Sequence, residues 1–71
     1  MAFKDNLQAY RIASGLTQKE LADKIGLSKV AICGYEKGTR KPDSDKLQAL
    51  ALALNCSADA LLFGADKPAA P

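Results

Sequence analysis

The chain has 71 residues, of which 48% are hydrophobic and 25% are charged, and its formal net charge is +2. These proportions are typical of one small folded domain and exclude an intrinsically disordered segment. A chain of this length buries only about 60% of the surface of its unfolded state, which leaves little room for a cleft of enzyme size.

The cysteines and the lengths of the apolar runs indicate the cellular compartment of the protein. Cys33 and Cys56 form neither a CxxC pair nor a Cys/His set, and the chain contains no histidine. A small secreted domain stapled by disulfides normally carries several more cysteines. No apolar run approaches the roughly 18 residues that span a membrane, and the N-terminus lacks the apolar core of a signal peptide. We therefore expect reduced thiols, a cytoplasmic location, no membrane partner, and no bound metal or cofactor.

Two helices are expected in the N-terminal part of the chain. The first spans about Phe3 to Ala13 and is ended by Gly15, because glycine adopts the left-handed conformation of a helix end at little cost. The second begins at the capping box TQKE of residues 17–20 and ends at Gly26. Apolar residues recur in both at helical spacing. Those expected to face inward are Phe3, Leu7, Tyr10, Leu21, Ala22 and Ile25.

A third helix is expected to begin after Ser28, to run to about Glu36 and to be closed by Gly38. The loop TRKPD follows, since proline cannot continue a helix. The charges change sign at this loop. Residues 28–41 contain four basic side chains against one glutamate, whereas residues 43–66 contain four aspartates against one lysine. A basic segment of this kind suits a polyanionic partner on one face of the molecule.

Two more helices are expected in the C-terminal part. The fourth is capped by Asp43 or Ser44 and ends at Asn55, and Ser57 caps a short fifth. The chain then continues as a proline- and alanine-rich tail over residues 64–71, which we expect to be flexible. The residues expected to face inward are Leu47, Leu50, Ala51, Leu54, Ala58, Leu61 and Leu62. Five short helices with short connections predict a compact all-α bundle.

One spacing carries most of the functional information. Relative positions zero, four, ten and thirteen are occupied by Ala22, Gly26, Ile32 and Tyr35. A helix-turn-helix needs a small residue where its helices cross, a glycine in the tight turn, and two apolar anchors on the second helix. With LTQKELADKIGLS, YEKGTRKP and LQALALALNCSADALL around this set, the chain resembles the Cro/repressor family of helix-turn-helix DNA-binding domains over residues 7–62.

The resemblance implies a lambda repressor-like, five-helix DNA-binding domain over residues 1–63. Its third helix would lie in the major groove of double-stranded DNA, and its second would cross the backbone. It implies a transcriptional regulator, repressor or Cro-like, from a phage or mobile element, which binds a pseudo-palindromic operator as a homodimer. Residues 64–71 are then either a natural end or the start of a linker to a missing C-terminal oligomerisation domain. No catalytic residues are expected.

Within this frame, the outward positions of the third helix are assigned to base reading. If Ile32 and Tyr35 face inward, a rotation of about 100° per residue turns Val30, Cys33, Gly34 and Lys37 outward and places Lys29 at the flank. Lys29 is expected to donate to a guanine and Val30 to contact thymine methyl groups. The plainer alternative for Val30 is an exposed side chain without a role, and Cys33 is better explained as a small neutral residue than as a redox switch. The set is Lys29, Val30, Cys33 and Gly34, where glycine would permit close approach of DNA or leave space for another side chain.

The resemblance also assigns a set of residues to the DNA backbone. Gln18 would clamp a phosphate, because its side-chain amide and the positive end of the second helix would both point at the anion. It is otherwise only a polar residue of the capping box, and the capping role alone would also explain Ser28. The full set is Thr17, Gln18, Ser28, Lys37, Thr39, Arg40 and Lys41.

Two further pairs follow from the resemblance. Arg11 and Glu36 would form a partly buried ion pair that joins the first and third helices without contacting DNA. Leu62 and Phe63, at the end of the fifth helix, would lie in the contact of a dimer that is weak in isolation and tightens on DNA. The alternative to DNA binding is a protein-interaction module, an antitoxin or adaptor that uses the same bundle.

Overall fold

The structure of the protein is a computed structural model, and it describes residues 2–64. These residues form α1 (Phe3–Ala13), α2 (Gln18–Ile25), α3 (Lys29–Lys37), α4 (Ser44–Ala53) and α5 (Ala58–Phe63), with no strand among them. The predicted five-helix, all-α fold is therefore confirmed. The prediction of a flexible tail falls on residues outside the described part of the chain, apart from Gly64.

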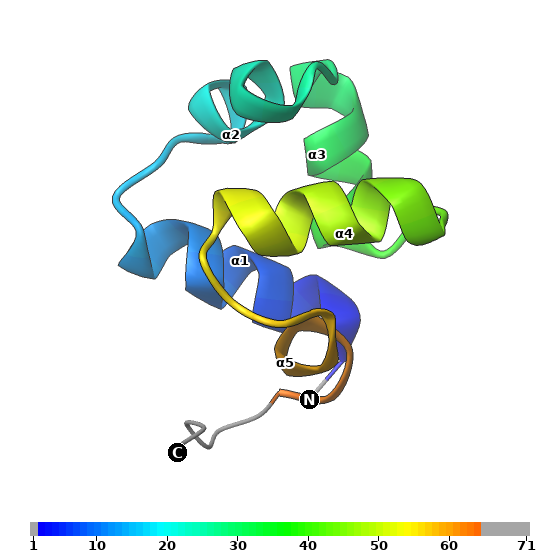
Figure 1. The fold of residues 1–71 in the computed structure, drawn as a ribbon. Helices are drawn as coiled ribbons and strands as arrows, with labels where there is room; N and C mark the ends of the chain where they lie inside the picture. Colours follow the sequence, from blue (N-terminus) through cyan, green and yellow to red (C-terminus); the bar gives the residue numbers. More distant parts are fainter. Residues whose placement is uncertain (1, 65–71) are drawn as a thin grey trace.

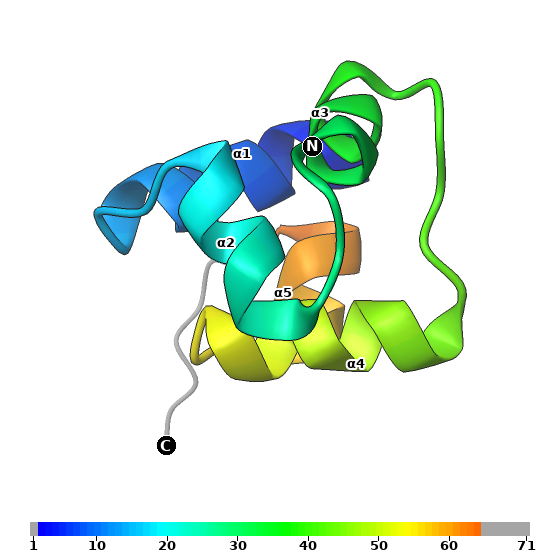
Figure 2. The same ribbon diagram turned by 90° about the horizontal axis from the view of Figure 1, so that it is seen from above.

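The elements are arranged so that α2 and α3 lie together at one end of the bundle and α5 lies at the other (Figure 1). α1 packs against α3 and α5, and α4 packs against α2 and α5. The loop from α3 to α4 runs around the outside of the bundle (Figure 2). Among residues 2–64, no helix is both long enough and apolar enough to cross a lipid bilayer.

Side-chain caps mark where α2, α3, α4 and α5 begin, whereas α1 has no side-chain cap. The Thr17 hydroxyl accepts from the Glu20 amide at 3.0 Å, and the Glu20 carboxylate accepts from the Thr17 amide at 2.8 Å, which completes the predicted capping box. Ser28 and Ser57 each accept a backbone N–H from the first turn of the helix they precede. Asp43, and not Ser44, is the N-cap of α4.

The turn between α2 and α3 depends on Gly26. Its φ of 73° lies in the left-handed region, and its amide donates to the carbonyl of Ala22. A side chain at this position would be strained, so the glycine permits the abrupt change of direction that the helix-turn-helix needs. Asn55, where α4 was predicted to end, also has a positive φ of 56°.

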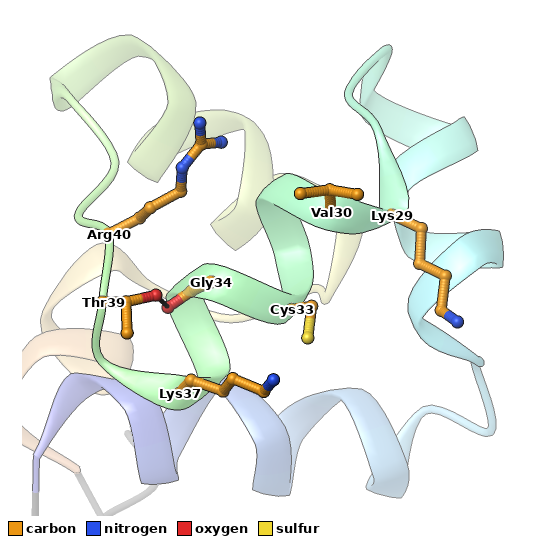
Figure 3. A pocket seen from close by; sticks show the side chains of 7 residues that line it. All are labelled: Lys29, Val30, Cys33, Gly34, Lys37, Thr39 and Arg40. Atoms are coloured by element: carbon orange, nitrogen blue, oxygen red, sulfur yellow. Dashed lines mark hydrogen bonds between the residues drawn. The ribbon is translucent and has the colours of Figure 1, made fainter.

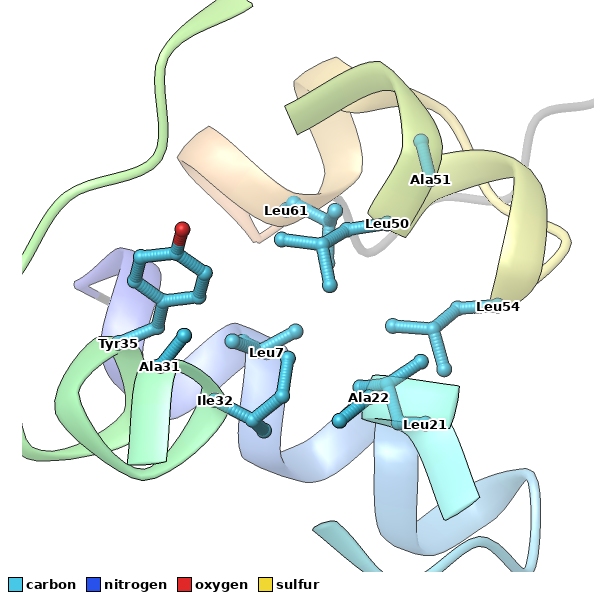
Figure 4. Close-up of a cluster of buried hydrophobic side chains, with 10 residues drawn as sticks. All are labelled: Leu7, Leu21, Ala22, Ala31, Ile32, Tyr35, Leu50, Ala51, Leu54 and Leu61. Atoms are coloured by element: carbon cyan, nitrogen blue, oxygen red, sulfur yellow. The ribbon is translucent and has the colours of Figure 1, made fainter. Parts of the chain in front are cut away.

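The core lies between all five helices and contains the two predicted anchors of α3 (Figure 4). Ile32 is fully buried and Tyr35 is 4% exposed, while Ala22 on α2 is 1% exposed. The inward side of α3 is therefore anchored in the core by Ile32 and Tyr35, as the spacing predicted. The buried cluster comprises Leu7, Leu21, Ala22, Ala31, Ile32, Tyr35, Leu50, Ala51, Leu54 and Leu61.

The inward face of α5 differs from the prediction. Ala60 and Leu61 are buried, whereas Ala58 is half-buried and Leu62 is 39% exposed. The stripes 57/60/61/64 and 58/61/62 both have the spacing of a helix face, and a six-residue helix is too short for its sequence to choose between them.

The packing of α1 against α5 determines which stripe is buried. Asn6, a buried polar side chain that the sequence patterns did not single out, donates from Nδ2 to the carbonyl of Leu61 at 2.9 Å. Because this bond fixes one side of α5 against α1, Leu62 is left at the margin of the core.

Candidate nucleic-acid interface

The outer face of α3 forms one wall of an open pocket of about 290 Å³. The pocket is lined by all four predicted base-reading residues together with Lys37, Thr39 and Arg40 (Figure 3). Val30 is 71% exposed, and Lys29 and Lys37 are exposed on either side of the half-buried Cys33. The prediction that Lys29, Val30 and Cys33 share one outward face of α3 is thus confirmed, with Cys33 the least exposed of the three.

Gly34 is the exception on this face, because it is buried. Its cover is the stem of Arg40: a Cβ built on Gly34 would lie 2.7 Å from Cδ and 2.9 Å from Cγ of that arginine. The expectation that Gly34 is open to solvent is therefore wrong. Of the two explanations considered for this glycine, the structure matches space for another side chain.

The end of α3 also holds the following loop in place. The carbonyl of Gly34 accepts from the backbone amides of Gly38, Thr39 and Arg40, the last two at 3.0 and 3.3 Å. The Thr39 hydroxyl donates to the same oxygen at 3.3 Å. The first two loop residues after Gly38 are thereby fixed against the helix, which brings Thr39 and Arg40 to the edge of the pocket.

Lys41 is separated from this face. It borders a second pocket of about 320 Å³, between the N-terminus of α1, the loop and α5. Arg40 borders both pockets, and the apolar lining of the second includes Phe3, Tyr35, Leu47 and Leu62. Adjacent basic residues of one loop therefore face different surroundings, which the sequence alone did not distinguish.

Gln18 has a protein partner. Its Nε2 donates to Oε1 of Glu36 at 3.0 Å, so the side chain bridges the first turn of α2 to α3. An amide nitrogen carries two hydrogens, and one remains for another acceptor. Thr17 and Ser28 lie at the starts of α2 and α3 and use their side-chain oxygens as caps.

Glu36 is the centre of a polar network that joins α3 to α1 and α2. Its carboxylate accepts from Nε of Arg11 at 2.6 Å and from Nη2 of the same side chain at 3.2 Å. Arg11 further donates from Nη1 to the carbonyl of Leu16 at 2.7 Å. The side chains of Arg11 and Glu36 are 12% and 4% exposed, so the ion pair implied by the resemblance forms and is shielded from solvent. A bidentate pair of this kind fixes geometry as well as charge.

Two further observations concern metal ligands and Cys56. No group of three or more His, Cys, Asp or Glu side chains in residues 2–64 is arranged to hold a metal ion. Burial raises the pKa of the Cys56 thiol, which packs against the core at the start of the turn into α5. This is the behaviour expected of a small apolar residue and not of a reactive thiolate.

Residues 7–61 of the chain match the helix-turn-helix family. The HTH-type transcriptional regulator YqaE of Bacillus subtilis (strain 168) is 40% identical over 62 residues, which are 87% of this chain and 53% of that protein. Repressor protein C2 of Salmonella phage P22 is 37% identical over 60 residues, which are 84% of this chain and 28% of that protein. The chain thus spans about half the length of the first of these relatives and less of the second.

Solved structures show the same relationship. The P22 c2 repressor in complex with a synthetic operator has a TM-score of 0.87 and 34% identity, with 92% of this chain and 98% of that chain covered. The restriction-modification controller protein C.AhdI from Aeromonas hydrophila has a TM-score of 0.81 and 33% identity, with 84% and 91% covered. The chain therefore belongs to the helix-turn-helix family in its Cro/repressor form, whose members are DNA-binding transcriptional regulators and not enzymes.

Proposed function

We propose that this chain binds double-stranded DNA with sequence specificity and regulates transcription, as a repressor or Cro-like protein of a phage or mobile element. One observation carries the proposal. Ile32 and Tyr35 anchor α3 in the core, and the opposite face of the helix presents an exposed valine among basic side chains. A helix supported in this way can enter the major groove without losing its own packing.

In this proposal the side chains along the pocket divide into two classes. Lys29 donates to a guanine edge, while Val30 contacts thymine methyl groups and the small side chain of Cys33 allows the helix to approach the bases closely. Gly34 lies on the same face under the stem of Arg40. Lys37 and the loop residues Thr39, Arg40 and Lys41 contact the DNA backbone from the C-terminal side of α3. At the other end of the helix pair the backbone is contacted by Thr17, Gln18 and Ser28.

Gln18 can serve this role without losing its partner. The bond to Glu36 occupies one of the two hydrogens on Nε2, and the backbone amide of Gln18 belongs to the first turn of α2. The first amides of a helix have no partner within the helix and favour an anion. Glu36 then holds the amide at the helix start, ready for a phosphate oxygen.

One domain of this size covers only one half-site, so we infer that two copies bind a pseudo-palindromic operator about one helical turn apart. Leu62 and Phe63 support a two-fold contact at the end of α5, since they are 39% and 71% exposed and adjacent. Two side chains give a small interface, so the dimer is weak in isolation and tightens on DNA. This function places the protein in the cytoplasm, where such operators lie.

The experiment that tests the proposal is selection of bound duplexes from a random pool, followed by affinity measurements over a range of salt concentrations. We expect one enriched sequence with approximate two-fold symmetry. We also expect log K to fall linearly with log salt concentration, by about 0.9 per phosphate neutralised. Absence of enrichment, with an affinity insensitive to salt, would overturn the proposal in favour of a protein partner for an antitoxin or adaptor.

Two lysine variants form a matched pair, in which Lys37→Ala is the test and Lys24→Ala is the control. Lys37 borders the pocket on α3, whereas Lys24 lies near the end of α2 beside Ile25 and Leu52, away from it. Lys37→Ala should reduce the salt slope by about one. Lys24→Ala should leave both the slope and the affinity unchanged, although it removes the same charge.

A further inference from the structure

The face of α3 contains one position without a side chain, and a side chain from the loop fills it. A Cβ on Gly34 would lie 2.7, 2.9 and 3.3 Å from Cδ, Cγ and Cβ of Arg40. The first two distances are shorter than real Cβ contacts, so the stem of Arg40 occupies the volume that a residue at position 34 would need. Glycine here also weakens the helix relative to alanine, which the space for Arg40 offsets.

Backbone hydrogen bonds also hold Arg40 beside the end of α3. Its amide donates to the carbonyl of Gly34, and the amide and hydroxyl of Thr39 donate to the same oxygen. Arg40 is exposed and forms no ion pair with any described residue. Its stem is therefore packed while its guanidinium, extended from the loop in Figure 3, is available to a ligand.

We propose that Arg40, instead of contacting the DNA backbone as assigned above, belongs to the base-reading set and donates to a guanine edge beside the bases that Val30 contacts; this inference rests on the proposed function. Arg40 shares the α3 pocket with Lys29, Val30 and Cys33, whereas its neighbour Lys41 borders only the second pocket. The outer face of α3 itself offers few donors. A planar guanidinium can bond O6 and N7 of guanine together, and this is the commonest specific contact of the major groove.

Gly34 is accordingly a positioning residue. It touches no base through a side chain, and its function is to admit the stem of Arg40 along the helix. A methyl group at position 34 would displace Cγ and Cδ of Arg40, which belong to a flexible side chain and can rotate away. We therefore expect Gly34→Ala to leave the fold intact and to displace the side chain of Arg40, while its backbone stays where it is.

The test compares Arg40→Ala with Lys41→Ala on the duplex selected by the wild type and on its single-base-pair variants. We expect Arg40→Ala to lose about tenfold to hundredfold in affinity for the selected duplex. It should also become indifferent to one base pair in each half-site, where the wild type requires guanine. Lys41→Ala should weaken all duplexes alike and reduce the salt slope by about one. Arg40→Lys keeps the charge but loses the planar fork, so it should recover only part of the discrimination.

The double variant tests the role of the glycine. Gly34→Ala should relax specificity at the same base pair as Arg40→Ala, and in the Arg40→Ala background it should have no further effect there. Melting curves establish that each variant is folded. If Gly34→Ala unfolds, the Arg40→Ala comparison still decides the base-reading assignment.

The possible results distinguish failure of the proposed function from failure of this inference alone. A wild type that enriches no duplex overturns the proposed function and this inference together. A wild type that binds, with an Arg40→Ala variant that weakens every duplex equally and lowers the salt slope, shows a phosphate contact and overturns only this inference. Full discrimination by a folded Gly34→Ala variant overturns the positioning role of the glycine.

Discussion

The side-chain amide of Gln18 donates to the carboxylate of Glu36, with 3.0 Å between Nε2 and Oε1, and so ties the first turn of α2 to the last turn of α3. The same carboxylate accepts two bonds from Arg11 on α1. One shielded carboxylate therefore joins three helices, including the one proposed to read DNA. Stability and the geometry of the surface proposed to bind DNA are expected to depend on the same carboxylate.

Glu36→Gln is expected to lower the free energy of unfolding by about 3–5 kcal/mol, because it leaves the charge of Arg11 in a shielded site without an opposite charge. The loss is large against the roughly 5–15 kcal/mol of a typical domain. Urea unfolding measures it as a fall in midpoint at constant slope. A useful control is Lys19→Ala, since the ion pair of Lys19 with Asp23 is 73% and 64% exposed and should contribute little. An unchanged midpoint for Glu36→Gln would contradict a stabilising role for the pair.

Val30→Ala is expected to weaken operator binding without changing stability by more than about 0.5 kcal/mol, because the side chain is 71% exposed in the free protein. Each methyl group removed from an apolar contact costs about 0.8 kcal/mol, or about fourfold in affinity. Replacing thymine by uracil in the selected operator should produce a loss of that size with the wild type, at the positions that Val30 contacts. The same replacement should have less effect on Val30→Ala. Equal affinity for thymine and uracil at every position would remove the methyl contact from the proposal.

Phe63→Ala is expected to shift the protein towards monomer in sedimentation experiments and to weaken binding to the full operator more than to a single half-site. The reason is that Phe63 is 71% exposed at the end of α5, where burial in a dimer would remove a large apolar surface from water. Leu52→Ala is the matched control, because Leu52 is 81% exposed on α4 and faces a different part of the surface. Should both variants sediment and bind as the wild type does, the dimer contact lies elsewhere.

Asp43→Asn is expected to reduce the loss of folding stability that acid pH causes. The backbone N–H of Lys46, 2.9 Å from Oδ1, and then its ammonium group lower the pKa of Asp43 below its ordinary value of 3.8. The unfolded chain then binds this proton more readily than the folded chain. The stabilisation is therefore complete above the ordinary pKa and is lost as the pH falls through the lowered pKa of the folded state.

Asparagine can retain the cap but does not titrate in this range, so thermal unfolding measured from pH 7 to pH 2 should separate the two proteins. The wild type should lose more stability across the acid range than Asp43→Asn does. Asp43→Ala, which removes the cap at every pH, should be less stable than Asp43→Asn at pH 7. Identical profiles for the wild type and Asp43→Asn would show that this carboxylate does not contribute.

Most of the helix boundaries were predictable from the sequence, because capping acts over three or four residues. The capping box of Thr17 and Glu20 begins α2, and Ser28 and Ser57 cap α3 and α5, all as predicted. Gly26 makes the turn between α2 and α3 with a positive φ. The inward anchors of α3 were also predictable, because a helix-turn-helix requires its small and apolar residues at fixed separations.

Other features depended on contacts between segments that are distant in the sequence or on small differences in orientation. The burial of Leu61 in preference to Leu62 depends on Asn6, which lies 55 positions earlier. Gln18 bonds Glu36, and the stem of Arg40 covers Gly34. Both contacts follow from how α2, α3 and the loop pack together. The sequence by itself therefore determined the five helices and the helix-turn-helix, because those signals are local. Only the tertiary structure decided that Arg40 lies over Gly34, because that contact requires the loop to fold back against the end of α3.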